Sequence, residues 1–401
     1  MSLKLILFYI LTFIVLYTEP IPIGGVSVGI AWKIVVILII ILPVLYKALR
    51  GKRMELFAVL YFLLAFKTFF SYTSLDYLME TIIIAVKITM FPLMYLFFME
   101  VKSETLLFIA KHYALAIILV FLPYHFGILE PFALGYDLDI YGLTGQYGLI
   151  GPFLSPHAAS ISLAFAMVVI SSLINSENSK MTNTFYVLIL LLGFYQLMLT
   201  YVRTGIAVYL ASLAFLYLQN LNMKKILLII MTIFVLVAGS IVLMENSKAV
   251  KMRFEDKNRY VKNQDVGLGS GRLDYWKAAV VNWANDEDIV IFIGLGYTYG
   301  IDKMEKSVGM RIFAHNDFFQ VLQQEGLIGF IIFISSLIAL YKYMKRYNSS
   351  KYYRNSMAIF IGMITMISFQ GSFYFTIVFF LAIYMVLQKQ EYLQEDLYEK
   401  I

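Results

Sequence analysis

The sequence contains no cysteine, only four histidines and few charged residues. Without cysteine the chain has no disulfide, no thiolate nucleophile and no cysteine-bound zinc. Four histidines argue against a metal site built from several imidazoles, so we expect no bound metal. Charged residues make up 14% of the chain, whereas soluble domains carry about 25%. The scarcity of charge argues against a soluble protein.

Apolar residues, by contrast, make up 61% of the chain and come in long unbroken runs. A helix that crosses a bilayer needs about 20 such residues. Twelve runs qualify, so we expect an all-α polytopic membrane protein with about twelve transmembrane helices. Only Gln370 and Gly371 divide the last two runs, which could instead form one broken helix and reduce the count to eleven. The expected spans are 3–18, 28–48, 54–72, 78–98, 104–122, 157–174, 183–200, 204–219, 224–244, 317–342, 355–370 and 372–388.

The distribution of lysine and arginine predicts the orientation of these spans. If the N-terminus is cytoplasmic, the short cytoplasmic loops hold thirteen basic residues and the short periplasmic loops hold one, Arg203. The C-terminus is then cytoplasmic too, and the net charge of +6 lies beside the cytoplasmic leaflet, so no nucleic-acid surface is needed to explain it. The thirteen residues are Lys47, Arg50, Lys52, Arg53, Lys102, Lys180, Lys224, Lys225, Lys342, Lys345, Arg346, Lys351 and Arg354.

Two long segments, 123–156 and 245–316, then fall on the periplasmic side. They separate the N-terminal spans (1–122), the middle spans (157–244) and the C-terminal spans with their cytoplasmic tail (317–401). We expect the larger segment to be a large helical periplasmic loop rather than an independent domain. The first apolar run is followed by no small-residue cleavage site, and we interpret it as an uncleaved span rather than a signal peptide.

Arg203 is the exception to the basic-residue distribution, since it lies at the periplasmic end of a span in Leu-Thr-Tyr-Val-Arg-Thr-Gly. A charge close to hydrocarbon is costly and usually has a reason. One interpretation is an arginine that reaches toward lipid phosphates. The other is an anion-binding site that faces the periplasm, to which Tyr201 of the same motif could contribute.

Arg272 follows a glycine-rich run, Gly267-Leu-Gly-Ser-Gly271, and begins an amphipathic stretch. Leu273, Trp276, Val280 and Trp283 share one side of that stretch, which is typical of a helix at the membrane interface with tryptophan anchors. The free N–H groups of a helix start attract anions, and an arginine there adds a bidentate donor. The alternative is a glycine turn with a solvated arginine. No Lys-Ser/Thr follows, so the run is not a Walker motif.

His315 stands in Ala-His-Asn-Asp-Phe-Phe, directly before another expected span. Asn316 or Asp317 is a plausible N-cap for that helix. The positive helix end disfavours imidazolium, so we expect His315 to be neutral near pH 7 and able to accept a proton. A capping-region histidine without chemistry is the alternative. Glu325 lies ten residues on, about 15 Å along a straight helix, and is not a direct partner of His315 unless the helix bends.

Several other polar residues are candidates for substrate binding on position alone. His157 begins an expected span at its periplasmic end, and Lys67 and Lys87 lie within spans toward the same side. A lysine there either reaches the interface or helps to hold a lipid-linked anion. The full set of substrate-binding candidates is Glu325, Asn316, Tyr201, His157, Lys67 and Lys87.

The motifs around these residues resemble those of the O-antigen ligase/polymerase superfamily, which includes Wzy-type polymerases and O-antigen ligases. The motifs are Thr-Tyr-Val-Arg203-Thr-Gly, Ser-Gly-Arg272-x-x-x-Trp276, Gly294-Leu-Gly-Tyr, and His315-Asn-Asp-Phe-Phe followed by Glu325-Gly-Leu-Ile-Gly. Their order and spacing fit, and the resemblance covers roughly residues 190–340. The first half of the chain resembles the superfamily only as a bundle of spans.

The resemblance implies inverting, metal-independent glycosyl transfer without a cofactor, on the periplasmic face of a bacterial inner membrane and in a GT-C-like fold. The donor and acceptor would be oligosaccharides linked to undecaprenyl diphosphate, and a chain-length regulator is a possible partner. In catalysis, Arg203 and Arg272 would stabilise the leaving diphosphate, and His315 would take the proton of the acceptor hydroxyl.

Three functions compete on the sequence. A polymerase would join lipid-linked repeat units, whereas a ligase of the same superfamily would move the finished glycan onto lipid A-core. A flippase or transporter of the lipid-linked unit is the third, and such proteins often show repeated halves and polar sites at the membrane midplane. This chain shows neither clearly, which disfavours transport. Between the other two functions we favour the polymerase, because polymerases are more numerous and more diverse than ligases.

Overall fold

The computed structural model describes residues 21–23, 26–28, 32, 35, 54–71, 78–135, 147–174, 179–218, 272–371 and 375–398. These residues are helical, apart from irregular connections and an antiparallel hairpin of two short strands, β1 (Pro22–Ile23) and β2 (Val26–Ser27). The expected spans 3–18 and 224–244, most of 28–48, and the glycine-rich run before Arg272 lie outside the described residues.

The helices follow the expected spans closely within the described residues. They are α3 (Leu56–Phe70), α4 (Leu78–Phe98), α5 (Ser103–Leu119), α6 (Phe121–His125), α7 (Pro156–Leu173), α8 (Lys180–Leu199), α9 (Arg203–Leu218), α12 (Arg272–Ala284), α13 (Asp288–Ile293), α14 (Tyr297–Val308), α15 (Asp317–Arg346), α16 (Tyr353–Phe369) and α17 (Phe375–Tyr398). In the described chain, the last two expected spans are separate helices, α16 and α17.

Five segments of the described chain are long and apolar enough to cross a membrane. They are Glu80–Phe98, Ser103–His125, Pro156–Leu173, Lys180–Leu199 and Asp317–Arg346. Two shorter apolar helices, Leu56–Phe70 and Arg203–Tyr217, accompany them. The chain is therefore a multi-pass membrane protein of helical type, as its composition predicts. The total of eleven or twelve spans stays a prediction.

Capping side chains set where two of the helices begin. The Ser155 hydroxyl accepts a hydrogen bond from the Ala158 N–H at 3.1 Å, and a proline takes the first position of α7. Asn316 caps α15, because its Oδ1 accepts from the N–H groups of Phe318 (3.0 Å) and Phe319 (3.3 Å). Each such cap stabilises a helix by about 1 kcal/mol. Of the two predicted caps for this helix, Asn316 and Asp317, the structure confirms Asn316.

The chain divides into two compact units. The first comprises residues 1–39, 102–256 and 354–365, and the second comprises residues 40–101, 257–353 and 366–401. The helix α16 contributes to both units. Each unit is described separately below.

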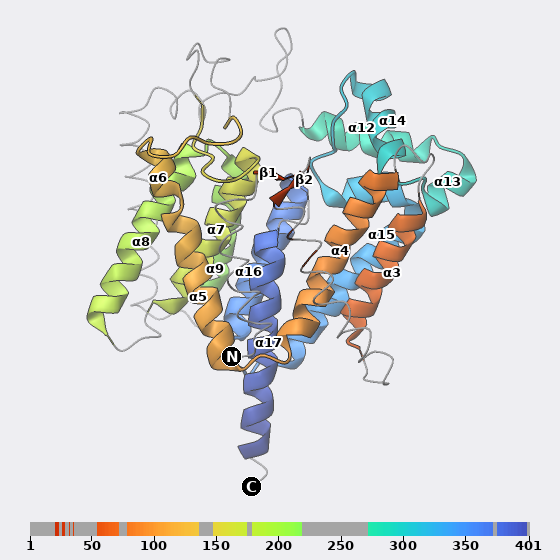
Figure 1. The fold of residues 1–401 in the computed structure, drawn as a ribbon. Coiled ribbons are helices and arrows are strands. Elements are labelled where there is room, and N and C mark those ends of the chain that lie inside the picture. The colour runs from red at the N-terminus through yellow and green to blue at the C-terminus, as the bar shows by residue number, and fades with distance from the viewer. Residues whose placement is uncertain are drawn as a thin grey trace. The chain divides into compact units, whose positions relative to one another are not determined.

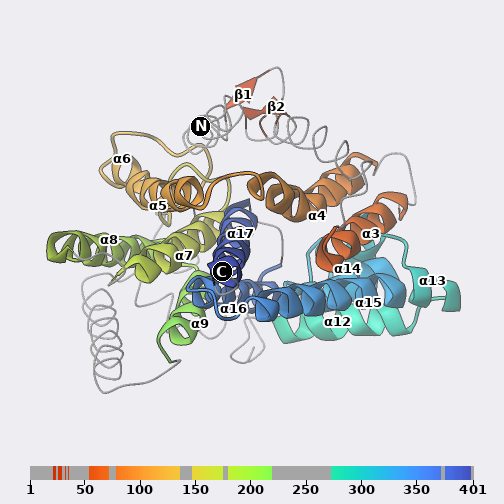
Figure 2. The same cartoon turned by 90° about the horizontal axis from the view of Figure 1, so that it is seen from below.

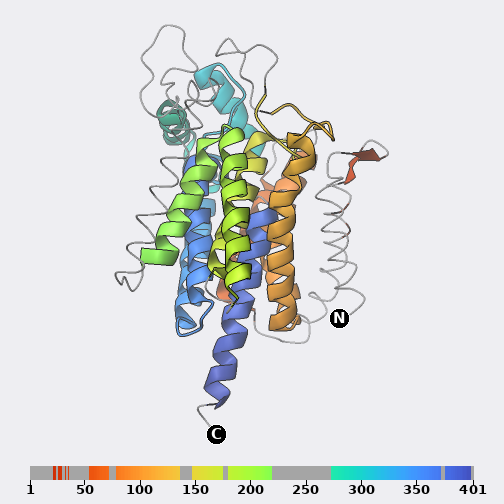
Figure 3. The same cartoon turned by 90° about the vertical axis from the view of Figure 1, so that its left-hand side faces the viewer.

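In the first unit, α7 packs against α5, α8 and α9, and these helices run side by side (Figure 3). From Ala159 onward nearly every residue of α7 is buried. The Ser160 hydroxyl donates to the Val202 carbonyl at 3.3 Å, just before α9 begins. A Cβ on Gly205 would collide with Ser160, so only glycine allows α9 to approach α7 this closely. The starts of α7 and α9 therefore lie together.

In the second unit, α3 packs between α4 and α15, and α17 packs against α4. Phe57 of α3 makes edge contacts with Tyr95 of α4 and Tyr343 of α15, with ring centroids 5.0 and 5.2 Å apart. The hydroxyls of Tyr95 and Tyr343 hydrogen-bond to each other at 2.6 Å. This buried aromatic group holds the three helices together.

The helix α15 is broken at Gly326, whose φ of 64° and ψ of −172° lie outside the helical region. Gly294 packs its backbone against this break, and a Cβ on either glycine would collide with the other's segment. The Gly296 N–H donates to the Gln324 carbonyl at 2.7 Å. The turn between α13 and α14 thus supplies a hydrogen-bond partner to a carbonyl at the break.

The two ends of the second unit differ in chemistry. At one end, Glu55 pairs with Lys389 at 2.8 Å and with Arg346 at 3.6 Å, and Lys351 pairs with Glu391 at 2.8 Å. At the other end, α12, α13 and α14 lie across the tips of α3, α4 and α15 (Figure 1). We call α12, α13 and α14 the cover. Arg346 and Lys351 belong to the expected cytoplasmic set, and the cover belongs to the expected periplasmic loop.

Candidate functional site

The cover is a small folded layer with its own apolar core. Tyr275, Ala279, Met304 and Ala314 form that core, and Phe319 of α15 packs against it. The helix α12 lies along α15, as the view in Figure 2 shows. The expectation of a helical arrangement in this part of the large loop is therefore confirmed for residues 272–308.

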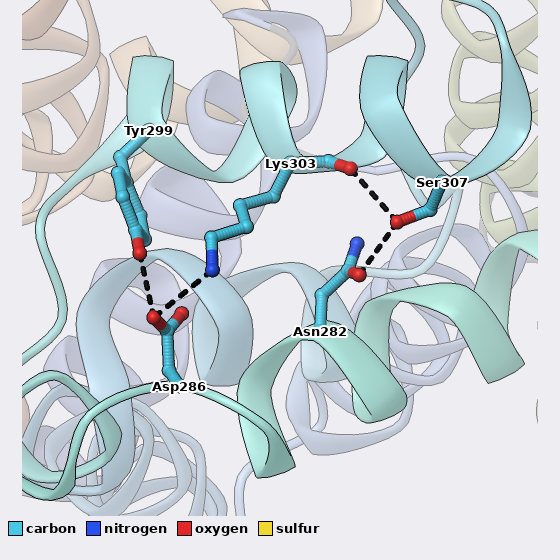
Figure 4. Close-up of polar contacts among 5 residues, drawn as sticks. All are labelled: Asn282, Asp286, Tyr299, Lys303 and Ser307. Carbon is cyan, nitrogen blue, oxygen red and sulfur yellow. Dashed lines mark hydrogen bonds and ion pairs between the residues drawn. The ribbon is translucent and has the colours of Figure 1, made fainter.

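Polar side chains also join α12 to α14, as Figure 4 shows. Asp286 accepts hydrogen bonds from the Tyr299 hydroxyl at 2.6 Å and from Lys303 Nζ at 3.1 Å. The Ser307 hydroxyl donates to Asn282 Oδ1 at 2.6 Å. These contacts fix α14 against the C-terminal half of α12, and so they hold the helix that begins with Arg272.

Arg272 occupies the first position of α12, as its sequence context predicts. Its Nη2 donates to Gln370 Oε1 over 3.5 Å. Gln370 comes directly after α16, 98 residues further along the chain. The guanidinium is half-buried, so it can meet a charged group that reaches this end of the unit.

His315 lies between the cover and α15 in a left-handed conformation, with φ of 53°. Its ring is 6.3 Å from the Tyr275 ring, and its Nδ1 is buried with no hydrogen-bond partner among the described residues. Burial lowers the pKa of the imidazole below its usual 6.5, and the nearby Arg272 charge lowers it further. The Gln370 backbone acts in the opposite direction and raises the pKa of His315. The expected neutral imidazole is thus supported, chiefly through burial and Arg272.

The two residues after His315 contact the same segment as Arg272 does. Asn316 Nδ2 donates to the Ser368 carbonyl at 3.0 Å, in addition to its capping role. Asp317 is buried, and a Cβ on Gly371 would lie 3.0 Å from its Oδ1. Asn316 therefore holds the start of α15 against the end of α16, which is a structural role beside its candidacy for substrate binding.

The tryptophans of α12 make protein contacts. The Trp276 ring lies 5.8 Å from the Phe319 ring and 6.3 Å from the Phe369 ring. Trp283 Nε1 donates to the Ile291 carbonyl at 3.0 Å. Both indoles help to hold α12 against its neighbours, and their service as membrane anchors stays a prediction.

Lys67 and Glu325 form an ion pair with each other. Lys67 Nζ lies 2.6 Å from Glu325 Oε2 and also donates to Ser71 Oγ at 3.1 Å. The two side chains are 16% and 6% exposed, so solvent screens the pair only weakly. Glu325, directly before the break at Gly326, pairs with a side chain of α3. In the described structure, Lys67 is thus a partner of a carboxylate, while its binding of a lipid-linked anion stays a prediction.

Lys87 differs from Lys67 in its surroundings. It is exposed on α4, in the same unit. The structure confirms that Lys87 lies within a helical span, since α4 runs from Leu78 to Phe98. The side of the membrane that it is nearer to stays a prediction. A role in substrate binding stays a prediction.

Arg203 lies in the first unit, at the first position of α9. The turn before it is tight: the Thr200 hydroxyl accepts from the Val202 N–H at 3.3 Å, and Tyr201 has φ of 56°. Tyr201 is buried at 7% exposure, so it shapes the turn more than it offers a surface. The guanidinium stands half-buried at a helix N-terminus.

His157 belongs to the first unit too, in the first turn of α7. It lies three residues before Ser160, which contacts the chain just ahead of Arg203. His157 and Arg203 therefore begin neighbouring helices at one end of this unit. Whether His157 binds substrate stays a prediction.

The second unit thus brings together a cation, a neutral imidazole and two buried acid or amide groups at one end. Such a set can bind a negatively charged group through Arg272 and accept a proton at His315. Within the described ranges, no three histidine, aspartate or glutamate side chains gather where they could hold a metal ion. The arrangement suits acid–base and electrostatic chemistry.

Sequence reasoning missed Ser368 and Gln370 as parts of this site. The sequence marks Gln370 and Gly371 only as a polar break between two apolar runs. A glutamine at the predicted periplasmic end of a span is the signal that could have drawn attention to them.

A comparison with protein families identifies a match. Residues 188–334 match the model of a family described as O-antigen ligase. The match covers just over a third of the chain, contains Arg203, Arg272, His315 and Glu325, and ends before Gln370. No curated protein matches the chain. The resemblance that the motifs indicate is therefore confirmed over nearly the range they predict.

Proposed function

Because the chain carries a domain of the O-antigen ligase family over residues 188–334, we propose that it is a polysaccharide polymerase acting on lipid-linked glycans. The family transfers glycans in membranes, and the specific reaction is our inference. The donor is a glycan on undecaprenyl diphosphate, and the acceptor is a lipid-linked repeat unit. The reaction takes place at the periplasmic face of the bacterial inner membrane.

The observation that carries this proposal is the juxtaposition of Arg272 and His315. Both lie at the cover end of the second unit, where Arg272 lies close enough to His315 to lower the pKa of the imidazole. Arg272 brings positive charge to the place where the imidazole is kept neutral. A glycosyl transfer that releases a diphosphate needs one group of each kind, close together.

The chemistry follows from these two groups. The acceptor hydroxyl oxygen attacks the anomeric carbon of the donor while the bond from that carbon to the phosphate oxygen breaks. His315 takes the proton from the hydroxyl, and the electron pair of the broken bond leaves with the diphosphate. Attack opposite to the leaving group inverts the anomeric carbon. Arg272 stabilises the charge that develops on the departing oxygen.

Arg203 is the second phosphate-binding residue in this proposal. It begins α9 as Arg272 begins α12, so each guanidinium stands at the positive end of a helix dipole. Such positions favour phosphate oxygens.

Alanine substitutions test these roles individually. Arg203→Ala, Arg272→Ala and His315→Ala are each expected to lower the rate of polymer formation at least a hundred-fold, in line with the loss of one electrostatic or acid–base group. Formation is measured with purified protein and a defined lipid-linked repeat unit, with membrane content determined alongside. Wild-type chain lengths in any variant would remove that residue from the site.

A ligase is the second candidate, since the description of the matched family names ligation. The two activities differ in acceptor, and a lipopolysaccharide gel of a deletion strain separates them. A core that carries a single repeat unit supports polymerisation. A bare core together with accumulating long lipid-linked chains supports ligation. If purified protein transfers glycan neither to a lipid-linked repeat unit nor to lipid A-core, transport would be favoured.

A further inference from the structure

Four consecutive residues at the end of α16 contact the motifs that carry the proposed chemistry. We call them the 368–371 segment. The Ser368 carbonyl accepts from Asn316 Nδ2 at 3.0 Å, and the Phe369 ring faces the Trp276 ring at 6.3 Å. Gln370 accepts a hydrogen bond from Arg272 and raises the pKa of His315 through its backbone, and Gly371 lies against Asp317. The segment therefore connects α12 with the start of α15.

Gln370 is the member of the segment that lies beside both groups of the proposed reaction. Its side-chain Oε1 accepts from Arg272 Nη2 at 3.5 Å, and its backbone raises the pKa of the His315 imidazole. Asn316, the residue after His315, is held to Ser368, two residues before Gln370. A movement of Gln370 would therefore alter the surroundings of the guanidinium and of the imidazole together. The residue is half-buried and follows the last turn of α16.

The backbone of the segment leaves little freedom for this placement. Gly371 has φ of 91°, a conformation that favours glycine, and a Cβ there would press on the Asp317 carboxylate. On the other side, Ser368 is held through its carbonyl by the residue that caps α15. The Gln370 side chain thus extends from a backbone fixed on both sides.

We propose that Gln370 is a positioning residue of the catalytic centre, which sets the placement of the Arg272 guanidinium relative to the His315 imidazole. The inference rests on the proposed glycosyl transfer for its kinetic consequences. It lies beyond the family-matched range, which ends at residue 334. The end of α16 is on this view a third component of the site, beside α12 and the start of α15.

The first test replaces the amide by an apolar side chain of similar length. Gln370→Met removes the acceptor for Arg272 and keeps the backbone contact, so kcat should fall about ten- to hundred-fold while KM for the donor changes less than three-fold. Gln390→Met is the matched control, because Gln390 donates an amide hydrogen bond to the Val101 carbonyl outside the site. The control should keep the wild-type kcat.

The second test uses the conservative variant Gln370→Glu, which places a carboxylate beside both groups. A negative charge there stabilises the imidazolium, so the pKa of His315 should rise. The side chains that face His315 from the packed elements are Arg272 and Tyr275 of α12, and both are retained. Ring-labelled histidine in a chain whose other three histidines are replaced reports this pKa by NMR without any substrate.

The outcomes separate the inference from the proposed function. An upward pKa shift in Gln370→Glu together with a lowered kcat in Gln370→Met supports the inference. A protein that fails to lengthen lipid-linked glycans but shows the pKa shift overturns the proposed function and leaves the placement of Gln370 intact. An unmoved His315 pKa, or wild-type kcat in Gln370→Met, overturns the inference. If Gln370→Met unfolds at a much lower temperature than the control, its lowered kcat could come from instability. The Gln370→Glu measurement then decides, and an unmoved His315 pKa in that variant overturns the inference.

Discussion

At the scale of single residues, His315 combines properties that are rarely found together in a capping region. It takes a left-handed backbone conformation, and its ring is largely buried beside a guanidinium. Left-handed residues other than glycine cost about 1 kcal/mol or more and tend to be kept where function requires them. The strained position places the imidazole between α12 and the end of α16.

The lowered pKa of His315 predicts the pH dependence of the reaction. A base acts in its neutral form, so the rate falls as the pH drops through the pKa of the imidazole. Because burial and Arg272 lower that pKa, the acid limb of kcat/KM should lie below pH 6.5. A pH series of kcat/KM at limiting acceptor measures the limb, and a midpoint above pH 6.5 would contradict the environment described for His315.

The sequence predicts the nearest contacts of these residues and misses the remote ones. Asn316 as N-cap and Arg272 in a first helical turn follow from local patterns, because capping depends on neighbours three residues away. Gln370 lies 98 residues from Arg272, and no local pattern encodes that contact. Its amide is recognisable as part of the site only once α16 is packed.

At the scale of elements, α15 is two helical pieces joined at Gly326. The first piece carries Asn316 and ends with Glu325, whose charge is balanced by Lys67 of α3. The sequence allows for a bend but does not locate it. Its geometry depends on the Gly294–Gly296 turn, which packs there from another part of the chain.

The Lys67–Glu325 pair can be tested by exchanging the charges. Lys67→Glu or Glu325→Lys alone buries two like charges, and each is expected to destabilise the protein by about 3–5 kcal/mol. The double exchange should recover most of that loss. Thermal unfolding in detergent measures the effect, and Lys87→Glu is the control because Lys87 is exposed.

Glycan transfer by the same variants distinguishes two roles for Lys67. Recovery of both stability and activity in the double exchange would mean that Lys67 acts through Glu325. A stable but inactive double variant would support the prediction that the lysine binds the lipid-linked anion directly.

At the scale of the whole molecule, composition alone predicts a helical membrane protein, and long unbroken apolar runs locate most of the described spans within a few residues. The runs succeed because lipid imposes a length and an apolar surface on each span. Composition does not predict how the chain divides into two units, since that depends on packing between distant segments.

The predicted orientation can be measured directly, because the natural chain has no cysteine. Lys306 in the cover and Ser349 between α15 and α16 are both exposed, so each can be replaced by a single cysteine that a reagent can reach. A membrane-impermeant maleimide added to intact spheroplasts should label Lys306→Cys, and it should label Ser349→Cys only after lysis. The reverse pattern would place the proposed catalytic centre in the cytoplasm.

The seam between the Gly294–Gly296 turn and the break at Gly326 is made of main chain on both sides. The close approach depends on glycine at both positions, because glycine has no Cβ, and no other residue is as small. Alanine, the mildest substitution elsewhere, is already too large at both Gly294 and Gly326. A smaller neighbouring side chain could not relieve the collision, because the atoms that a new Cβ would meet are backbone atoms. Substitutions on the exposed surface of the cover can therefore be tolerated, whereas any substitution at Gly294 or Gly326 would disrupt the packing between the turn and the break.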